Sequence, residues 1–201
     1  MTMVYQLDII ILRWLNSWTG ASIFFDWAII FRATYLFYAL VAALLLFTGL
    51  TFLPRFRAYR RKNFELVIFA LISAIIARFG VTELIRFFYN RPRPFEALEG
   101  VHQLVNQAGG GSFPSGHAAF SFALAAAVAF YYPKTSVLFF LAAFSMGMGR
   151  IAAGVHWPSD ILGGAIVGVL TALALQYILK KKILLKFHFN RIHFNRIKTP
   201  M

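Results

Sequence analysis

Apolar residues gather into runs long enough to cross a membrane, and short polar or basic stretches separate these runs. The clearest runs cover residues 33–53, 64–89, 114–130, 136–153 and 158–179. A membrane-spanning helix needs about 20 predominantly apolar residues, and the runs meet or approach that length. The pattern therefore predicts an all-α, polytopic transmembrane helical bundle with five clear spans.

The N-terminal segment has a different pattern. In residues 4–31, apolar clusters alternate with polar side chains, among them Asp8, Arg13, Asn16 and Asp26. These interruptions favour an amphipathic interfacial or re-entrant segment over a spanning helix. A sixth span in this segment stays open as an alternative.

Composition agrees with a membrane protein. Of the 201 residues, 60% are hydrophobic and 13% are charged, whereas a soluble domain has roughly 45–50% apolar and about 25% charged residues. The chain has no cysteine, which excludes a disulfide and a thiolate nucleophile. We attribute the net charge of +13 to lysine and arginine beside the membrane, and we expect no nucleic-acid partner.

The basic residues also divide the chain and orient it. Residues 1–182 are predicted to form one transmembrane domain, and residues 183–201 a basic tail in which the pentapeptide HFNRI occurs twice. We expect this tail to rest on an anionic membrane surface. Most lysines and arginines lie in the tail, in the loop after the first span and at Lys134. In a five-span topology these segments share one side, which the positive-inside rule makes cytoplasmic.

Three segments that carry polar and reactive groups then meet at the opposite face. They are Arg86 with Arg93-Pro94, Pro114-Ser115-Gly116-His117, and Gly149-Arg150 with His156 and Asp160. Arginines offer planar, permanently charged donors that match phosphate oxygens. The helix that begins after Ser115 adds backbone amides and a positive dipole end. We therefore predict that Arg86, Arg93, Ser115, Gly116 and Arg150 bind an anion with several oxygens.

Two histidines and an aspartate could act on that anion. His156 and Asp160 lie four residues apart at the start of the last helix, so the carboxylate can reach one imidazole nitrogen and leave the other to attack phosphorus. His117 can protonate the departing oxygen. We interpret these residues as nucleophile, orienting carboxylate and general acid.

The same residues allow other interpretations. Ser115 could serve only as a helix cap, and a histidine near a helix end could do the same. A metal site is the chemical rival, but the surplus of arginine and the absence of H-x-x-x-H or H-E-x-x-H spacing argue against it. We expect neither a metal nor another cofactor.

Some further residues in the spans are informative. Arg78 and Glu83 lie inside the second span, where ionisable groups are costly and either pair with each other, reach for the membrane surface or have a function. Glu83 and Arg86 are three residues apart and could pair. Gly164 and Gly168 form a small-xxx-small face that favours close helix packing.

The three segments resemble the signature of the type 2 phosphatidic acid phosphatase superfamily. Its usual forms are K-x6-R-P, P-S-G-H and S-R-x5-H-x3-D, and the match spans residues 86–160. Arg86 stands where the family usually has lysine, and Gly149 where it often has serine. Neither change affects the proposed nucleophile, acid or orienting carboxylate, so we expect activity to survive.

The resemblance implies a metal-independent phosphatase that acts on lipid phosphates or diphosphates through a phosphohistidine at His156. Residues 93–95, 101–105 and 112–114 are also similar to bacterial undecaprenyl-diphosphate phosphatases of the bacitracin-resistance type. The predicted function is removal of the terminal phosphate of undecaprenyl diphosphate at the outer face of the bacterial inner membrane. The alternatives are a phosphatidic acid or phosphatidylglycerol phosphate phosphatase, and a non-catalytic anion-binding or transport protein that would not need the His156–Asp160 pair.

Overall fold

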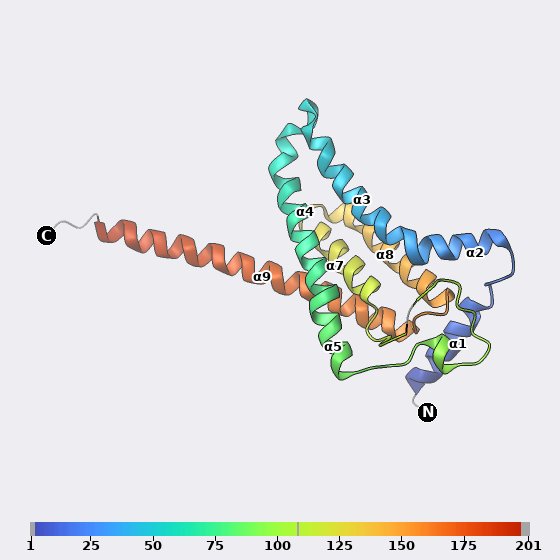
Figure 1. Cartoon of the computed structure of the whole chain (residues 1–201). Helices are drawn as coiled ribbons and strands as arrows, with labels where there is room; N and C mark the ends of the chain where they lie inside the picture. Colours follow the sequence, from blue (N-terminus) through green and yellow to red (C-terminus); the bar gives the residue numbers. More distant parts are fainter. Residues whose placement is uncertain (1–2, 108, 198–201) are drawn as a thin grey trace.

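The computed structural model describes residues 3–107 and 109–197, with side chains as far as residue 181. The helices are α1 (Met3–Asn16), α2 (Ile23–Ile30), α3 (Leu36–Gly49), α4 (Arg60–Ile75), α5 (Thr82–Phe88), α6 (Pro94–Ala97), α7 (Gly116–Tyr131), α8 (Pro133–Ala152) and α9 (Pro158–Ile197) (Figure 1). No strand occurs in the described ranges. The all-α prediction is confirmed.

Several of these helices are suited to a membrane. Ile23–Phe52, Pro54–Phe88, Pro133–Ala152 and Pro158–Lys181 are each long and apolar enough to cross one, and Gly116–Tyr131 is a shorter apolar helix. They form a helical membrane bundle, as the sequence predicts. The number of spans stays a prediction.

The first long helix begins earlier than predicted. The sequence pattern placed its start near residue 33, but α2 continues through the π-helical residues Phe31–Tyr35 into α3, so residues 23–31 belong to this helix. Ser22 caps it by accepting a hydrogen bond from the amide of Phe25. Asp26, which looked like an interruption, lies in the first turn, where a carboxylate stabilises a helix. The chain changes direction between α2 and α3 (Figure 1), as expected at a π-helical stretch.

Helix α1 covers the first part of residues 4–31, which the sequence pattern predicted to be amphipathic or re-entrant. Its buried residues are Asp8, Leu12 and Asn16, which share one face because residues four apart lie above one another on a helix. Leu12 packs in a core cluster with Trp157. The Asn16 amide donates to two backbone carbonyls, at 2.9 and 2.7 Å. These contacts dock α1 onto the end of the bundle where α8 ends and α9 begins.

Two further helices also begin earlier than the sequence pattern predicts. The helix predicted over 64–89 begins with a 3₁₀ segment at Pro54–Tyr59 and ends at Phe88, and α8 begins at Pro133, three residues before the predicted start at residue 136. Helix α9 continues to Ile197, so the predicted tail starts within it. Its side chains beyond residue 181, including the repeated pentapeptide, lie outside the described residues.

Helix α7 lies at the centre of the bundle and packs very closely on α9. A Cβ atom at Gly164 would lie 2.4 Å from the carbonyl oxygen of Ser115, and one at Gly168 would lie 2.3 Å from that of Ala119. The predicted small-residue face therefore lets the two backbones touch. This contact fixes the start of α7 against α9, and the Ser115 amide donates to the backbone oxygen of Asp160 at 2.9 Å.

We predict that Gly168→Ala destabilises the protein by about 1–3 kcal/mol, the usual cost of overpacking a closely packed contact. The matched control is Gly49→Ala in α3, where an added Cβ has no atom within 4 Å and alanine favours the helix by about 1 kcal/mol. Thermal unfolding in detergent would measure both. If Gly168→Ala unfolded at the same temperature as Gly49→Ala, the α7–α9 contact would not be a packing constraint.

Candidate active site

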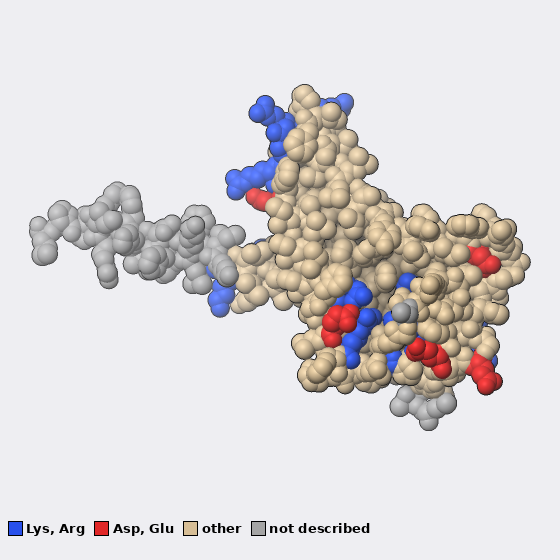
Figure 2. Space-filling model, viewed as in Figure 1, with Lys and Arg blue, Asp and Glu red and all other residues tan. Residues whose placement is uncertain are grey.

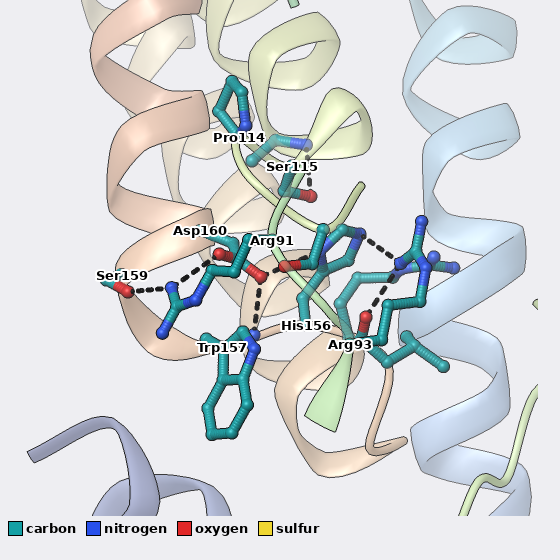
Figure 3. Close-up of polar contacts among 12 residues, drawn as sticks. Arg91, Arg93, Pro114, Ser115, His156, Trp157, Ser159 and Asp160 are labelled. Atoms are coloured by element: carbon teal, nitrogen blue, oxygen red, sulfur yellow. Dashed lines mark hydrogen bonds and ion pairs between the residues drawn. The ribbon is translucent and has the colours of Figure 1, made fainter. Parts of the chain in front are cut away.

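The structure brings every predicted site residue to one end of the bundle. Arg86 lies on α5, Arg93 directly before α6, Ser115, Gly116 and His117 at the start of α7, Arg150 near the end of α8, and His156 and Asp160 around the start of α9. Figure 2 shows basic side chains set into a hollow at this end, with acidic side chains beside them. Figure 3 shows part of the cluster from within.

His156 and Asp160 form a buried pair. The Nδ1 atom of His156 lies 3.3 Å from Oδ2 of Asp160, and the two residues are 1% and 0% exposed. Asp160 Oδ2 also accepts the backbone amide of Trp157 at 2.8 Å. The other ring nitrogen, Nε2, faces Arg93 at 3.5 Å (Figure 3). The carboxylate thus occupies one nitrogen and leaves the other toward the arginines, as the spacing predicts.

Three arginines surround this imidazole with little neutralising charge. Arg86 donates to the carbonyl of Pro114 at 2.9 Å and Arg93 to that of Val155 at 2.9 Å. Among the described side chains, neither Arg93 nor Arg150 forms an ion pair with a carboxylate. In the same set, the buried Nε atoms of Arg86, Arg93 and Arg150 have no hydrogen-bond partner. Buried charge without a partner is costly, so the site favours an anion with several oxygens.

Burial and the same arginines keep His156 neutral. Burial lowers the pKa of its imidazole well below the ordinary value of 6.5, and the positive charges of Arg150, Arg93 and Arg86 lower this pKa further. The imidazole is therefore neutral at physiological pH. A neutral imidazole has the lone pair that attack on phosphorus requires.

The start of α7 is arranged partly as a helix cap. The Ser115 side chain accepts the amide of Ala118 at 3.5 Å, which matches the cap interpretation, and its own amide is bound to Asp160. A phosphate contact from Ser115 is thus limited to its hydroxyl hydrogen. The His117 ring packs on Phe37, with centroids 5.4 Å apart, and lies within electrostatic range of His156.

The predicted site did not include Arg78, but the structure places it there. A Cβ atom at Gly116 would lie 2.4 Å from the Arg78 side chain, so this glycine makes room for the guanidinium. Glu83 pairs with both Arg78 and Arg86, which confirms the predicted Glu83–Arg86 pair. The sequence did mark Arg78 as an ionisable residue inside a span. Arg78 lies outside the three signature motifs, however, so the motifs alone did not assign it to the site.

Close backbone approach explains why glycine stands at position 149. A Cβ atom there would lie 2.7 Å from the Cβ of Arg32 and 2.8 Å from the amide nitrogen of Ala33. The π-helical bend of the first long helix therefore packs directly against α8. Arg150 reaches the same bend through a 3.4 Å contact with the Ala33 carbonyl. A serine at 149 would displace this contact.

Two further residues missed by the sequence reasoning are Arg91 and Asp8. Arg91 donates to Asp160 at 2.9 Å and to Asp8 at 2.7 Å. Arg91 lies two residues before Arg93 of the signature, whereas Asp8 lies far outside residues 86–160. No local pattern connects Asp8 with the site.

Comparison with known proteins gives a family and several relatives. The model of the PAP2 superfamily matches residues 66–184, which include all candidate site residues except Asp8. The chain is 38% identical over 81 residues to the bacitracin transport permease protein BcrC of Bacillus licheniformis, covering 40% of each. It is 35% identical over 82 residues to the undecaprenyl-diphosphatase BcrC of Bacillus subtilis, covering 41% of this chain and 42% of that protein.

A lipid A 1-phosphatase of Rhizobium etli is 42% identical over 57 residues, which are 28% of this chain and 25% of that protein. The chain thus spans less than half the length of these curated relatives. Among solved structures, Aquifex aeolicus LpxE has a TM-score of 0.64 and 28% identity, and the match covers 87% of this chain and 98% of that one.

We predict that His156 stays neutral at pH 6.5, where an unperturbed histidine is about half protonated, because burial and the arginines lower its pKa. Side-chain ¹⁵N shifts would measure this in detergent without phosphate, with the His156 signals identified by their loss in His156→Ala. Half-protonation of His156 near pH 6.5 would contradict the electrostatic description of the site.

Proposed function

The chain belongs to the PAP2 superfamily, and we propose that it removes the terminal phosphate of undecaprenyl diphosphate through a phosphohistidine formed on His156. The family and the apolar helices support an integral membrane lipid phosphatase. The specific substrate, the residue roles and the orientation in the membrane are our proposals.

One observation carries the proposal: Nε2 of His156 faces Arg93, and the positive charges of Arg86, Arg93 and Arg150 act on this imidazole. Each of the three arginines has a buried Nε without a hydrogen-bond partner among the described side chains. A phosphate group supplies enough acceptor oxygens to satisfy several of these donors at once. It would also place phosphorus close to Nε2. Binding and attack therefore need the same arrangement.

In the proposed reaction, Nε2 of His156 attacks phosphorus and the bond between phosphorus and the leaving oxygen breaks. The bound phosphate offsets the positive charge of the arginines, and a protonated His117 gives its proton to that oxygen, so the lipid monophosphate leaves. Asp160 holds the Nδ1 hydrogen and stabilises the positive charge on the ring. Water then attacks the phosphohistidine, with His117 accepting its proton, and inorganic phosphate is released. Arg86, Arg93 and Arg150 stabilise the charge on the transferring group.

The choice of substrate rests on the relatives. One of them is named an undecaprenyl-diphosphatase. Residues 93–95, 101–105 and 112–114 of this chain also resemble phosphatases of that kind. A lipid A 1-phosphatase is a second candidate because its short match is 42% identical. Another relative is named a transport permease, which suggests the alternative of a non-catalytic anion-binding or transport protein. Binding alone would not require the buried His156–Asp160 pair.

We further propose that the site faces outward from the bacterial inner membrane and that the C-terminus is cytoplasmic. The basic loop around Pro54–Arg61 lies at the far end of the bundle from the site (Figures 1 and 2). Lysine and arginine concentrate on cytoplasmic loops. The substrate headgroup would then enter from outside while its tail stays in the lipid.

His156→Ala is expected to lower phosphate release on the order of 10⁶-fold, the loss seen when a covalent nucleophile is removed. The matched control is His102→Ala, which should keep wild-type turnover because His102 is exposed in the segment between α6 and α7. Malachite-green detection of phosphate from purified protein would measure both, with thermal unfolding as a test of folding. A folded His156→Ala protein that turns over normally would refute the mechanism.

A panel of lipid substrates tests the specificity. We expect undecaprenyl diphosphate to give the highest kcat/KM, ahead of phosphatidic acid, phosphatidylglycerol phosphate and lipid A, and EDTA to leave the rates unchanged. A preference for another lipid would reassign the substrate within the family. Loss of activity with EDTA and its return with a divalent ion would contradict metal independence, and tight phosphate binding without release from any lipid would favour the binding-only alternative.

A further inference from the structure

Arg91 lies between two buried carboxylates, one of which belongs to the candidate site. Its Nη1 donates to Asp160 Oδ1 at 2.9 Å, and its Nη2 donates to Asp8 Oδ2 at 2.7 Å. Asp8 is 2% exposed and Asp160 is 0% exposed. Figure 3 shows Arg91 on the side of Asp160 that faces away from His156. The guanidinium thus links the N-terminal helix to the proposed orienting carboxylate.

This contact fixes both oxygens of Asp160. Oδ1 is held by Arg91, while Oδ2 is shared between His156 Nδ1 and the backbone amide of Trp157. A carboxylate held on both oxygens cannot rotate away from the imidazole without losing one of these contacts. The position of Asp160 therefore depends on the position of Arg91.

The position of Arg91 depends in turn on Asp8. Of the two carboxylates that Arg91 contacts, Asp8 is the one outside the proposed chemistry. Ser159 also accepts a hydrogen bond from Arg91 at 2.7 Å, and the guanidinium lies 4.9 Å from the Trp157 ring. Since a guanidinium is a rigid planar fork, loss of the Asp8 anchor would let it turn and weaken its hold on Asp160.

Asp8 is itself firmly placed. One oxygen accepts the Ser159 amide at 2.8 Å and the other accepts the Ser159 hydroxyl at 2.5 Å. Leu12 and Asn16, which follow on the same face of α1, are buried in the protein. The carboxylate also lies at the first turn of α9, where a helix N-terminus favours negative charge.

We propose that Asp8 is a positioning residue for the phosphatase reaction: it orients Arg91, which holds Asp160 against His156. This inference rests on the proposed function. It gives the amphipathic N-terminal helix a role in the active site, although this helix lies outside the residues matched by the family model. Asp8 does not touch the reacting atoms and acts only through Arg91.

The test compares Asp8→Asn, Arg91→Gln and the double variant, with phosphate release from undecaprenyl diphosphate as the readout. Asp8→Asn is expected to lower kcat by roughly 10- to 100-fold while KM changes little. This is the range seen for residues that orient metal ligands through hydrogen bonds, a comparable positioning role. The matched control is Asp26→Asn, the same change on α2, where the carboxylate contacts only the backbone amide of Gly20 among the described residues. It should keep wild-type kcat.

The double variant separates positioning from general destabilisation. If Asp8 acts through Arg91, adding Asp8→Asn to Arg91→Gln lowers kcat little further, because the contact is already lost. The proposal is overturned if Asp8→Asn keeps wild-type kcat, or if it lowers kcat by the same factor with and without Arg91. In either case wild-type turnover and its loss in His156→Ala would leave the proposed function intact. Absence of turnover in the wild-type protein would instead refute the proposed function itself.

Discussion

Like charges crowd around one buried imidazole, and the rest of the site depends on how the protein tolerates them. Arg86, Arg93 and Arg150 lie around His156, and their Nε atoms have no partner among the described residues. In a low-dielectric interior this repulsion is strong. Burial has the larger effect, and together with this repulsion it lowers the pKa of the imidazole and keeps the ring neutral. The repulsion also leaves the cluster in need of an anion. The same repulsion thus prepares both the nucleophile and the binding of its phosphate.

Such a cluster can persist only on a rigid frame, and backbone contact supplies that frame. Helices α7 and α9 touch at glycines, and the amide at the start of α7 binds the backbone of Asp160. The cap of one helix and the orienting carboxylate on the other are therefore parts of one packed unit. Glycine at 149 plays a similar part on α8, because it admits the bend of the first long helix beside Arg150.

The N-terminal helix adds a carboxylate to this arrangement from outside the shared family region. Through Asp8 and Arg91 it contacts the carboxylate of Asp160, and Leu12 anchors it in the core. Asp8 and Asp160 thus pair with Arg91, and Glu83 pairs with Arg86. Among the described side chains, Arg93 and Arg150 pair with no carboxylate. The centre is left for a ligand. Because the carboxylates neutralise only some of the arginines, the basic site can stay folded while the remaining arginines are available to bind phosphate.

The sequence by itself determined the helical class, the approximate helices, and the pairing of His156 with Asp160, because these depend on apolar periodicity and on spacing within one helix. It also indicated that Gly164 and Gly168 allow close packing. Only the tertiary structure decided that Arg78 joins the cluster and that Arg91 connects Asp8 with Asp160. It also moved the start of the first long helix to Ile23, where a cap and Asp26 at the first turn favour helix despite the polar residues. These features arise from contacts between distant segments or from the position of a polar residue at a helix end, and apolar patterning encodes neither.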